Sequence, residues 1–502
     1  TNPEMPEEKR NKLHILFVSC EQVGHINPMI PWIRECVARG HKVTLATDPK
    51  RKNLVEGLDM YILPIKGMNS ISEIKSRAKK GFIAKYYTLY TAFRDMAGNA
   101  YHILEQYVTD PKIGKVDVMV VDFFMPDGFD IADKYNIPVF NCYPNPVPVA
   151  CNSIRFFGPP HRMIGFPYHM SLSQRITNFF FGFSNKVMNT MVMLGPNIRR
   201  RSRGLPSFSD GFPCPDKSSQ YAVLSKTAYG FEWATYTAPH IHLVGITAPK
   251  SLPEVNTKLK QWLDQAKQTG QEVIYISFGS HAELSKSKLE ILLKSLQTII
   301  KDLKTRVVWS LRDKQRALLQ GKDEKVRGLR VESWVKQHSL LAHPAVTLFI
   351  SHGGSNSLHE SILQKVPLVT LPQGADQFDN SARIMHSGIG LRAYGMGPKL
   401  VQAVKNVRSN PSVKRNMDRV YYLMTKAGGG KKVADILEDT AFLGGYDYLL
   451  PYENKVKPNP WITLGFNALL IGTGIGLLRV GLLIFGRKTA QLNVRDMTII
   501  LK

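Results

Sequence analysis

Short apolar runs alternate along the chain with polar, glycine- and proline-containing segments. In the first half, these runs cover residues 13–19, 42–47, 116–121 and 137–142. Between the first two we expect a helix that starts at Asn27-Pro28, because asparagine suits the N-cap and proline the first helical turn. Arg39-Gly40 has the composition of a helix end. Strand, helix and strand in this order predict a parallel sheet covered by helices.

The second half of the chain repeats this pattern after a proline-containing segment. Its strand-like runs cover residues 273–280, 306–310, 346–350 and 366–371. A chain of 502 residues is also too long for a single hydrophobic core. We therefore predict an α/β protein with two doubly wound, Rossmann-like domains that face a cleft. The expected units are an N-terminal domain at 13–246, a linker at 247–256, a C-terminal domain at 257–440 and a return segment at 441–460.

The segment at 461–485 is almost entirely apolar, and Arg479 is its only charged residue. As a helix it would be about 37 Å long, which is enough to cross a bilayer with some tilt. We expect a transmembrane helix here, followed by a basic tail at 486–502. The alternative interpretation is a buried core helix at the edge of a domain. A second apolar region, at 179–194, is expected to line a pocket or pack in the core, with contact to a membrane surface as the alternative.

The chain is basic, with a formal net charge of +26. Its basic residues are dispersed and no nucleic-acid motif accompanies them, so we do not expect nucleic-acid binding. Anionic lipid or a diphosphate substrate explains the charge better, and a solvated basic surface is the alternative for the densest cluster, Arg199–Arg203. The five cysteines include no CxxC pair, so neither a disulfide framework nor a zinc site is expected. Cys20 and Cys36 are interpreted as small apolar packing groups.

The strand predicted at 346–350 leads into a His-Gly-Gly turn, and a helical pattern begins at Ser355. A strand, a glycine turn and a helix N-terminus form an anion site at the carboxyl edge of a parallel sheet. The turn has neither the dinucleotide-binding nor the Walker spacing. Asn356 and Glu360 are four residues apart, so they share one helix face, and a carboxylate there suits ribose hydroxyls.

The block from Trp334 to Gln377, which contains this turn, resembles the donor-binding signature of family 1 UDP-glycosyltransferases. The resemblance implies the GT-B fold. It also implies that Trp334 stacks on uracil, Glu360 contacts the ribose, and Asp376 with Gln377 holds the donor sugar. One departure is Lys336, where the family usually has proline. The donor contacts implied as a set are Ser280, Trp334, Val335, Gln337, His352, Gly354, Asn356, Ser357, Glu360, Asp376 and Gln377.

Two further residues have the chemistry of an acid–base pair. His25 follows the first strand, and Asp122 ends another strand of the same half, so both lie at the edge where open α/β sheets bind ligands. Transfer of a sugar to a hydroxyl needs a base for the hydroxyl proton, and a carboxylate orients the imidazole of that base. The resemblance assigns the same two roles to His25 and Asp122.

Together these observations predict an inverting, metal-independent transferase. It would move glucose or glucuronate from a UDP-sugar, its co-substrate, to a hydroxyl of a small lipophilic acceptor, with no cofactor. The alternatives are a sterol or sphingolipid glucosyltransferase of the same fold, a catalytically silent nucleotide-sugar-binding partner, and a GT-B epimerase. A homo-oligomer is compatible with this interpretation.

We expect a single-pass protein of the endoplasmic reticulum membrane. Animal members of the family suggest a lumenal body after removal of a signal peptide. Residues 1–12 lack the apolar segment of a signal peptide. The chain also has no Asn-x-Ser/Thr sequon, because its one candidate, Asn410, is followed by proline. These two features favour a cytosolic body with a C-terminal anchor, so the side of the membrane stays open.

Overall fold

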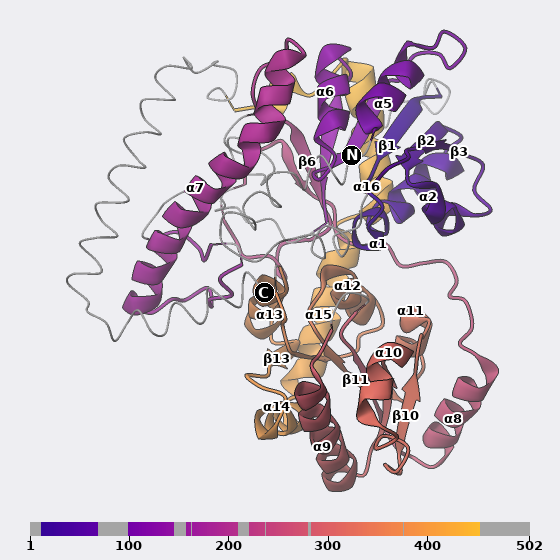
Figure 1. Cartoon of the computed structure of the whole chain (residues 1–502), viewed down its shortest axis with the longest axis vertical. Helices are drawn as coiled ribbons and strands as arrows, with labels where there is room; N and C mark the ends of the chain where they lie inside the picture. Colours follow the sequence, from indigo (N-terminus) through magenta and orange to yellow (C-terminus); the bar gives the residue numbers. More distant parts are fainter. Residues whose placement is uncertain are drawn as a thin grey trace, which may run out of the picture.

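The structure is a computed structural model that describes residues 12–68, 99–144, 157–161, 163–208, 220–235, 237–279, 283–374 and 376–451. Two parallel sheets lie one above the other in Figure 1, each with helices around it. The upper sheet is built from the first half of the chain and the lower sheet from the second half. The predicted pair of Rossmann-like domains is confirmed.

The first sheet has the strand order β3-β2-β1-β4-β5-β6-β7, and all its pairings are parallel. Strands β1 and β4 are neighbours in the middle, with Val18 opposite Val121. The segments after these two strands therefore emerge side by side, which is where open α/β sheets bind ligands. The strands are β1 (His14–Val18), β2 (Lys42–Thr47), β3 (Tyr61–Pro64), β4 (Val118–Asp122), β5 (Val139–Tyr143), β6 (Ala222–Ser225) and β7 (Ile241–Leu243).

Both faces of this sheet are buried. Leu16 and Val18 pack into the core on one face of β1, and Ile15 and Phe17 pack into the core on the other. This is why the strand appears in the sequence as a continuous apolar run. The helices of the first half are α1 (Val23–Ile26), α2 (Ile30–Ala38), η2 (Pro49–Val55), α5 (Ala100–Thr109), α6 (Pro126–Lys134) and α7 (Leu172–Ser202).

The start of the first long helix differs from the prediction at Asn27. A short helix, α1, comes first, and the backbone N–H of Asn27 closes it by donating to the carbonyl of Val23. Helix α2 then begins at Ile30, with Pro31 in its first turn in place of Pro28. His25 therefore lies in a helical turn.

The second sheet has the strand order β10-β9-β8-β11-β12-β13, again all parallel. Its central neighbours β8 and β11 end together, with Ser277 opposite Ser351. The strands are β8 (Val273–Ser277), β9 (Arg306–Ser310), β10 (Leu329–Glu332), β11 (Val346–Ser351), β12 (Leu368–Thr370) and β13 (Gly390–Arg392). The accompanying helices are α8 (Thr257–Gln268), α9 (Lys286–Leu303), α10 (Asp313–Arg316), η3 (Ala317–Leu319), α11 (Gln337–Leu341), α12 (Ser355–Leu363), α13 (Gln377–His386), α14 (Pro398–Ser409) and α15 (Ser412–Lys426).

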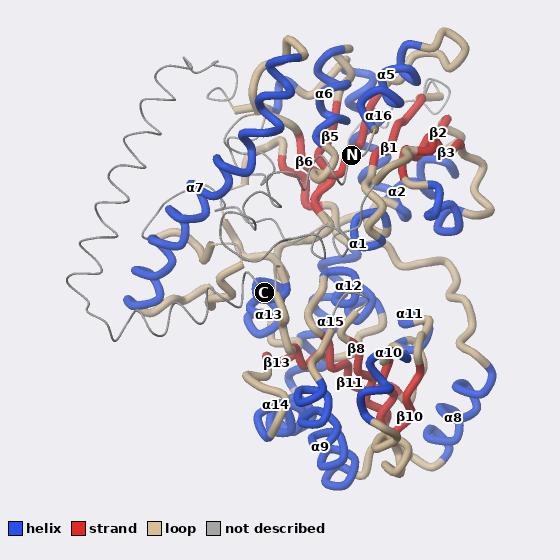
Figure 2. Tube along the Cα trace, viewed as in Figure 1, coloured by secondary structure: helices blue, strands red, loops and turns tan. Residues whose placement is uncertain are grey.

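The chain then returns to the first domain through α16 (Gly429–Leu443), followed by η4 (Asp447–Leu449). Helix α16 lies beside α2 (Figure 2), and buried residues of the two helices share one hydrophobic core. The guanidinium of Arg39 donates to Asp435 Oδ1 at 2.7 Å and to Glu438 Oε1 at 3.0 Å. A Cβ on Gly430 would lie 2.6 Å from the carbonyl oxygen of Pro31, so the two helices touch through backbone. The sequence-based bounds assigned this helix to the second domain, whereas it packs on the first.

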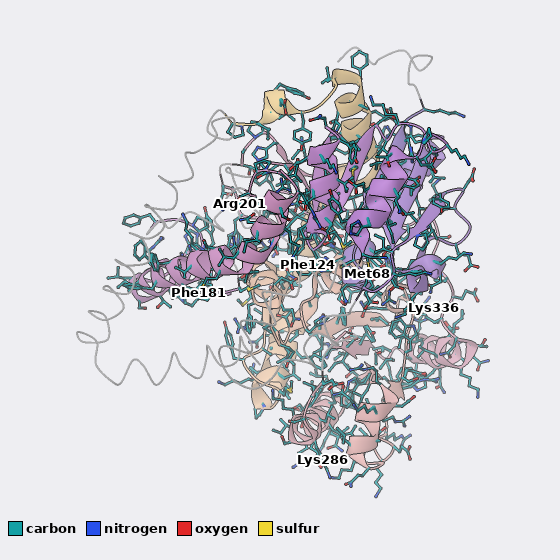
Figure 3. All side chains as sticks on the ribbon, turned by 45° about the horizontal axis from the view of Figure 1, so that its top comes forward. Met68, Phe124, Phe181, Arg201, Lys286 and Lys336 are labelled. Carbon is teal, nitrogen blue, oxygen red and sulfur yellow. The ribbon has the colours of Figure 1, made fainter. Side chains whose placement is uncertain are left out.

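Helix α7 extends away from the first domain, and Phe181 marks its outer part in Figure 3. Core packing, expected for residues 179–194, holds for the buried Met193 but is wrong for Phe180 and Leu194, which are 38% and 49% exposed. The outer half of the helix has little of the first domain beside it in this view, which accounts for the exposure of Phe180.

The basic cluster at the end of α7 also differs from expectation. Arg200 is buried and donates to Asp130 Oδ1 at 2.6 Å, and Arg203 donates to Asp127 Oδ1 at 2.6 Å. A free basic surface is therefore wrong for these two arginines, which fasten α7 to α6.

In the part of the chain that the structure describes, no helix is long and apolar enough to cross a membrane. The predicted transmembrane helix at 461–485 and the basic tail at 486–502 lie outside that part. Cys20, Cys36 and Cys142 are free thiols and buried. Cys151 and Cys214 lie outside the described residues.

Candidate active site

His25 and Asp122 are brought together by the pairing of β1 with β4. The Nδ1 atom of His25 lies 2.7 Å from Asp122 Oδ2, and the backbone N–H of Phe124 donates to Asp122 Oδ1 at 2.7 Å. The carboxylate is fully buried, while the imidazole keeps 14% of its surface exposed. An ionised carboxylate only accepts hydrogen bonds, so Nδ1 carries the proton of the neutral ring and Nε2 keeps a free lone pair. This is the arrangement of a general base with its orienting carboxylate.

Two aromatic side chains that the sequence analysis did not single out surround the imidazole. The ring of Phe124 stacks on His25 with a centroid distance of 4.6 Å, and the ring of Phe123 lies at 5.3 Å. Both residues follow Asp122 directly in the chain. Their position just after the end of β4 is the one feature of the sequence that could have placed them at this site.

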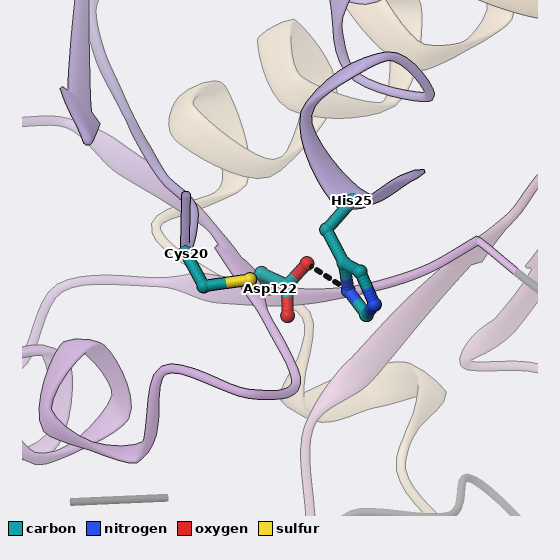
Figure 4. Close-up of side chains that lie close together, drawn as sticks. All are labelled: Cys20, His25 and Asp122. Carbon is teal, nitrogen blue, oxygen red and sulfur yellow. Dashed lines mark hydrogen bonds and ion pairs between the residues drawn. The ribbon is translucent and has the colours of Figure 1, made fainter. Parts of the chain in front are cut away.

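Besides His25 and Asp122, the side chain of Cys20 lies at this site. Figure 4 shows its sulfur directed toward Asp122, on the side away from His25. Sγ of Cys20, the imidazole nitrogen and the carboxylate oxygen lie within 4.8 Å of one another. Burial, and after it the charge of Asp122, raises the pKa of the Cys20 thiol well above its usual range. Cys20 belongs to the hydrophobic core of the first domain, so its predicted apolar packing is confirmed, but the sequence analysis did not foresee its place beside His25 and Asp122.

On the opposite domain, the predicted anion turn follows β11. Gly354 is the N-cap of α12, and Gly353 has a φ of +86°, a conformation that favours glycine. The imidazole of His352 fits between two glycines. A Cβ on Gly279 would lie 2.9 Å from its Cε1 atom, and a Cβ on Gly354 would lie 2.5 Å from its Nε2 atom. The helix N-terminus and this ring together offer donors to a phosphate.

The residues expected to hold the uridine also converge. Gln337 Nε2 donates to Ser357 Oγ at 3.0 Å and to Glu360 Oε2 at 2.7 Å. Burial raises the pKa of the Glu360 carboxyl. Trp334 is 74% exposed, which excludes the core position and leaves its face free for a ligand, while Val335 is buried. Ser280 lies outside the described residues.

Asp376 and Gln377, the expected sugar-holding pair, start helix α13 beside the anion turn. Asp376 Oδ2 accepts from Ser355 Oγ at 3.2 Å and from Asn380 Nδ2 at 2.9 Å. Asp376 is the N-cap residue of α13, but its side chain does not cap that helix. Its carboxylate instead accepts the hydrogen bond from Ser355, the first residue of α12. Gln377 Oε1 accepts from the backbone N–H of Gln373 at 2.7 Å.

The same helix is fixed to the first domain by contacts that the sequence did not reveal. The carboxylate of Asp379 accepts from the backbone N–H groups of Met163 at 2.8 Å and Gly165 at 3.3 Å. Arg383 donates to Glu232 at 2.8 Å, and its guanidinium lies 4.2 Å from the ring centroid of Trp233. These partners are far away in the sequence, so no local pattern marks them.

A direct contact also joins the two half-sites. Asn356 Nδ2, in the first turn of α12, donates to the backbone carbonyl of Gly24 at 3.5 Å. Gly24 precedes His25, so this contact places the first turn of α12 next to the short helix that carries the base of the dyad.

Comparison with known proteins assigns this architecture. A sequence model described as "UDP-glucoronosyl and UDP-glucosyl transferase" matches residues 64–425, which is more than half of the chain. The chain belongs to the UDP-glycosyltransferase family. The family resemblance and the enzyme class predicted from the sequence are thereby confirmed.

Individual relatives are distant. UDP-glucuronosyltransferase 3A1 of Xenopus laevis is 24% identical over 67% of this chain and 65% of its own length. UDP-glycosyltransferase UGT4 of Dactylopius coccus is 26% identical over 80% of both chains. The alignment thus leaves about a third of the frog protein unmatched.

Solved structures show the same fold. The glycotransferase of kitacinnamycin superposes with a TM-score of 0.63 at 20% identity, covering 86% of this chain and 99% of that one. Os79 from O. sativa, solved in complex with UDP, superposes with a TM-score of 0.59 at 18% identity over 85% of this chain and 99% of its own. The GT-B arrangement expected from the resemblance is confirmed.

Proposed function

We propose that this protein transfers a sugar from a UDP-sugar to a hydroxyl of a small lipophilic acceptor, with inversion at the anomeric carbon. The observation that carries the proposal is the hydrogen-bonded His25–Asp122 pair, next to which the contact between Asn356 and Gly24 brings the first turn of α12. Glucose and glucuronate are the two donor sugars proposed.

The chemistry follows from the free lone pair on Nε2 of His25. That atom takes the acceptor's hydroxyl proton while the hydroxyl oxygen forms its bond to the anomeric carbon. The bond from that carbon to the diphosphate breaks, and its electron pair leaves with UDP. Attack opposite to the leaving group gives inversion. The carboxylate of Asp122, 2.7 Å from Nδ1, stabilises the imidazolium that results.

The second domain supplies the leaving-group side. The backbone N–H groups at the start of α12 and the ring of His352 would neutralise charge that develops on the diphosphate. Trp334 would stack on uracil, Glu360 would bind the ribose, and Asp376 with Gln377 would hold the sugar. With these donors in place we propose that neither a metal ion nor a cofactor takes part.

The test is the substitution His25→Ala. It should lower kcat by a factor on the order of a hundred or more, because the general base is lost, and leave the affinity for UDP unchanged. Turnover close to that of the unmodified enzyme would contradict the assignment of the base. Addition of EDTA should leave the rate unchanged, and a rate lost to EDTA and restored by Mg²⁺ would contradict metal independence.

A sterol or sphingolipid acceptor remains the alternative within the same chemistry. Product analysis with a labelled donor and a panel of acceptors distinguishes it. A silent nucleotide-sugar-binding partner is disfavoured by the intact hydrogen bond between His25 and Asp122, since such a protein needs no general base. Complete absence of turnover and of UDP-sugar hydrolysis would favour it.

Membrane attachment through residues 461–485 and residence in the endoplasmic reticulum belong to the same proposal. They are supported by the apolar sequence of that segment. Protease protection in sealed microsomes tests both the anchor and the side on which the catalytic body lies.

A further inference from the structure

Cys20, His25 and Asp122 form a compact set of side chains of metal-ligating types: Cys20 follows β1, His25 lies in α1, and Asp122 ends β4. Their sulfur, nitrogen and oxygen atoms lie within 4.8 Å of one another. Cys20 and Asp122 are buried, whereas the side chain of His25 is 14% exposed to solvent. Figure 4 shows the carboxylate between the sulfur and the imidazole. In the residues that the structure describes, this is the one such group that includes a thiol.

The distances suit a small cation. Zinc binds at about 2.3 Å from sulfur and about 2.0 Å from nitrogen and oxygen, so tetrahedral ligand atoms lie roughly 3.3–3.5 Å apart. Nδ1 of His25 and Oδ2 of Asp122 are 2.7 Å apart, and the sulfur of Cys20 lies within 4.8 Å of one ring nitrogen and one carboxylate oxygen. Side-chain shifts of about 1 Å would therefore bring the three ligands to a cation, with water in the fourth position. The mixture of sulfur, nitrogen and oxygen favours a thiophilic ion such as Zn²⁺ over Mg²⁺ or Ca²⁺.

Binding at this place would change the tautomer of the base. In the dyad, Nδ1–H donates to Asp122, and the lone pair that accepts the acceptor's proton is on Nε2. A cation at Nδ1 takes the lone pair of that atom, so the ring proton must move to Nε2. The thiol proton is displaced to solvent. With a proton on Nε2 the ring cannot receive another from the acceptor hydroxyl.

We propose that Cys20, His25 and Asp122 bind a thiophilic divalent cation such as Zn²⁺, and that its occupancy switches the catalytic base off. The second half of this proposal rests on the proposed function of His25. The first half concerns binding alone and is tested separately. Cys20 is the residue that distinguishes this site from an ordinary His–Asp pair.

The binding test uses Co²⁺ as a spectroscopic substitute for Zn²⁺ on the full-length protein. Coordination by Cys20 produces a thiolate-to-cobalt charge-transfer band. The band should disappear in Cys20→Ala and in Cys20→Ser, and it should persist in Cys142→Ala. Cys142 is the matched control because it is equally buried and pairs with Asp122 across the sheet, but is not one of the three ligands. No band in the unmodified protein, or an equal band in Cys20→Ala, would overturn the proposal.

The activity test follows Zn²⁺ inhibition of sugar transfer. The concentration for half-inhibition should be at least ~10-fold higher in Cys20→Ala than in the unmodified enzyme, and a chelator should restore the rate. Cys142→Ala should keep the sensitivity of the unmodified enzyme. Equal inhibition of both cysteine variants would refute the switch. A cobalt band that needs Cys20, without any inhibition, would show that the site binds metal but that His25 is not the base.

Discussion

The ring of Phe124 stacks on the imidazole of His25 at 4.6 Å between centroids, with 28° between the ring planes. The backbone N–H of Phe124 meanwhile donates to the carboxylate oxygen of Asp122 that does not face His25. One residue therefore holds both members of the dyad, one through its side chain and the other through its backbone. Its ring restricts the imidazole to one orientation, which general-base catalysis requires.

We predict that Phe124→Ala lowers kcat roughly tenfold or more while the KM for the UDP-sugar stays unchanged. The ring that fixes His25 is lost, whereas the backbone hydrogen bond to Asp122 remains. Phe124→Tyr keeps the ring and should retain most of the rate. Steady-state kinetics with both variants checks this, with Phe442→Ala as the control, since Phe442 is 71% exposed on α16. Equal losses in the alanine and tyrosine variants would argue against stacking.

Trp334 is predicted to contribute to donor affinity rather than to the chemical step. Its side chain is 74% exposed, so its removal costs little packing. Stacking of a base on an aromatic ring is worth about 1–3 kcal/mol, so Trp334→Ala should weaken UDP binding roughly 5- to 150-fold. Titration calorimetry with UDP measures this. Trp334→Phe should recover part of the affinity, and an unchanged dissociation constant in Trp334→Ala would remove the uracil contact from the site.

The ion pair between Arg383 and Glu232 is predicted to stabilise the joint between the domains. Both side chains are buried, and Arg383 is in the same helix as Gln377, which we propose to hold the donor sugar. Arg383→Met should lower the free energy of unfolding by about 3–5 kcal/mol, because a buried charge loses its opposite. Urea unfolding checks it. The double variant Arg383→Met/Glu232→Gln should regain part of the loss, and independent, additive losses would show that the pair is not coupled.

Stability should fall on mild acidification. Burial lowers the pKa of His161, His242 and His338 to about 4, from an ordinary value of 6.5. Between these values the unfolded chain binds protons that the folded chain does not, so the stabilisation is complete above pH 6.5 and is lost as the pH falls to 4. Within that window each of these histidines lowers the free energy of unfolding by about 1.4 kcal/mol for every unit by which the pH falls.

Urea unfolding at pH 7 and pH 5 measures the effect, and His161→Gln should reduce the difference. His102→Gln is the control, because His102 is exposed on α5. A free energy of unfolding that is the same at both pH values would contradict the prediction.

Features carried by neighbouring residues could be predicted from the sequence. The strand, turn and helix from Val346 to Leu363 form one continuous pattern in the sequence. The glycines of the turn indicate that backbone packs closely against the ring of His352. The His25–Asp122 pair could be expected because His25 follows β1 and Asp122 ends β4, and the carboxyl ends of these neighbouring strands share one edge. Cys20 ends the same strand region, but a lone buried cysteine has no pattern that separates packing from ligation.

Features that depend on distant partners could not be predicted. The exposure of Phe180 depends on how far α7 extends beyond the first domain, which its own apolar composition does not encode. The Asp379 carboxylate meets backbone N–H groups more than two hundred residues earlier, and no side-chain type marks those groups in advance. The start of α2 could not be predicted because Pro28 and Pro31 are equally suited to the first turn of a helix, and the structure has Pro31 there.

Helix α16 packs on α2, so the first domain is built from two segments of the chain that are separated by the whole second domain. A ribosome has to translate more than four hundred residues before Asp435 and Glu438 can reach Arg39. Until then the apolar side chains of α2 lack the partners that α16 supplies, so the first domain completes its core only after most of the chain has been translated.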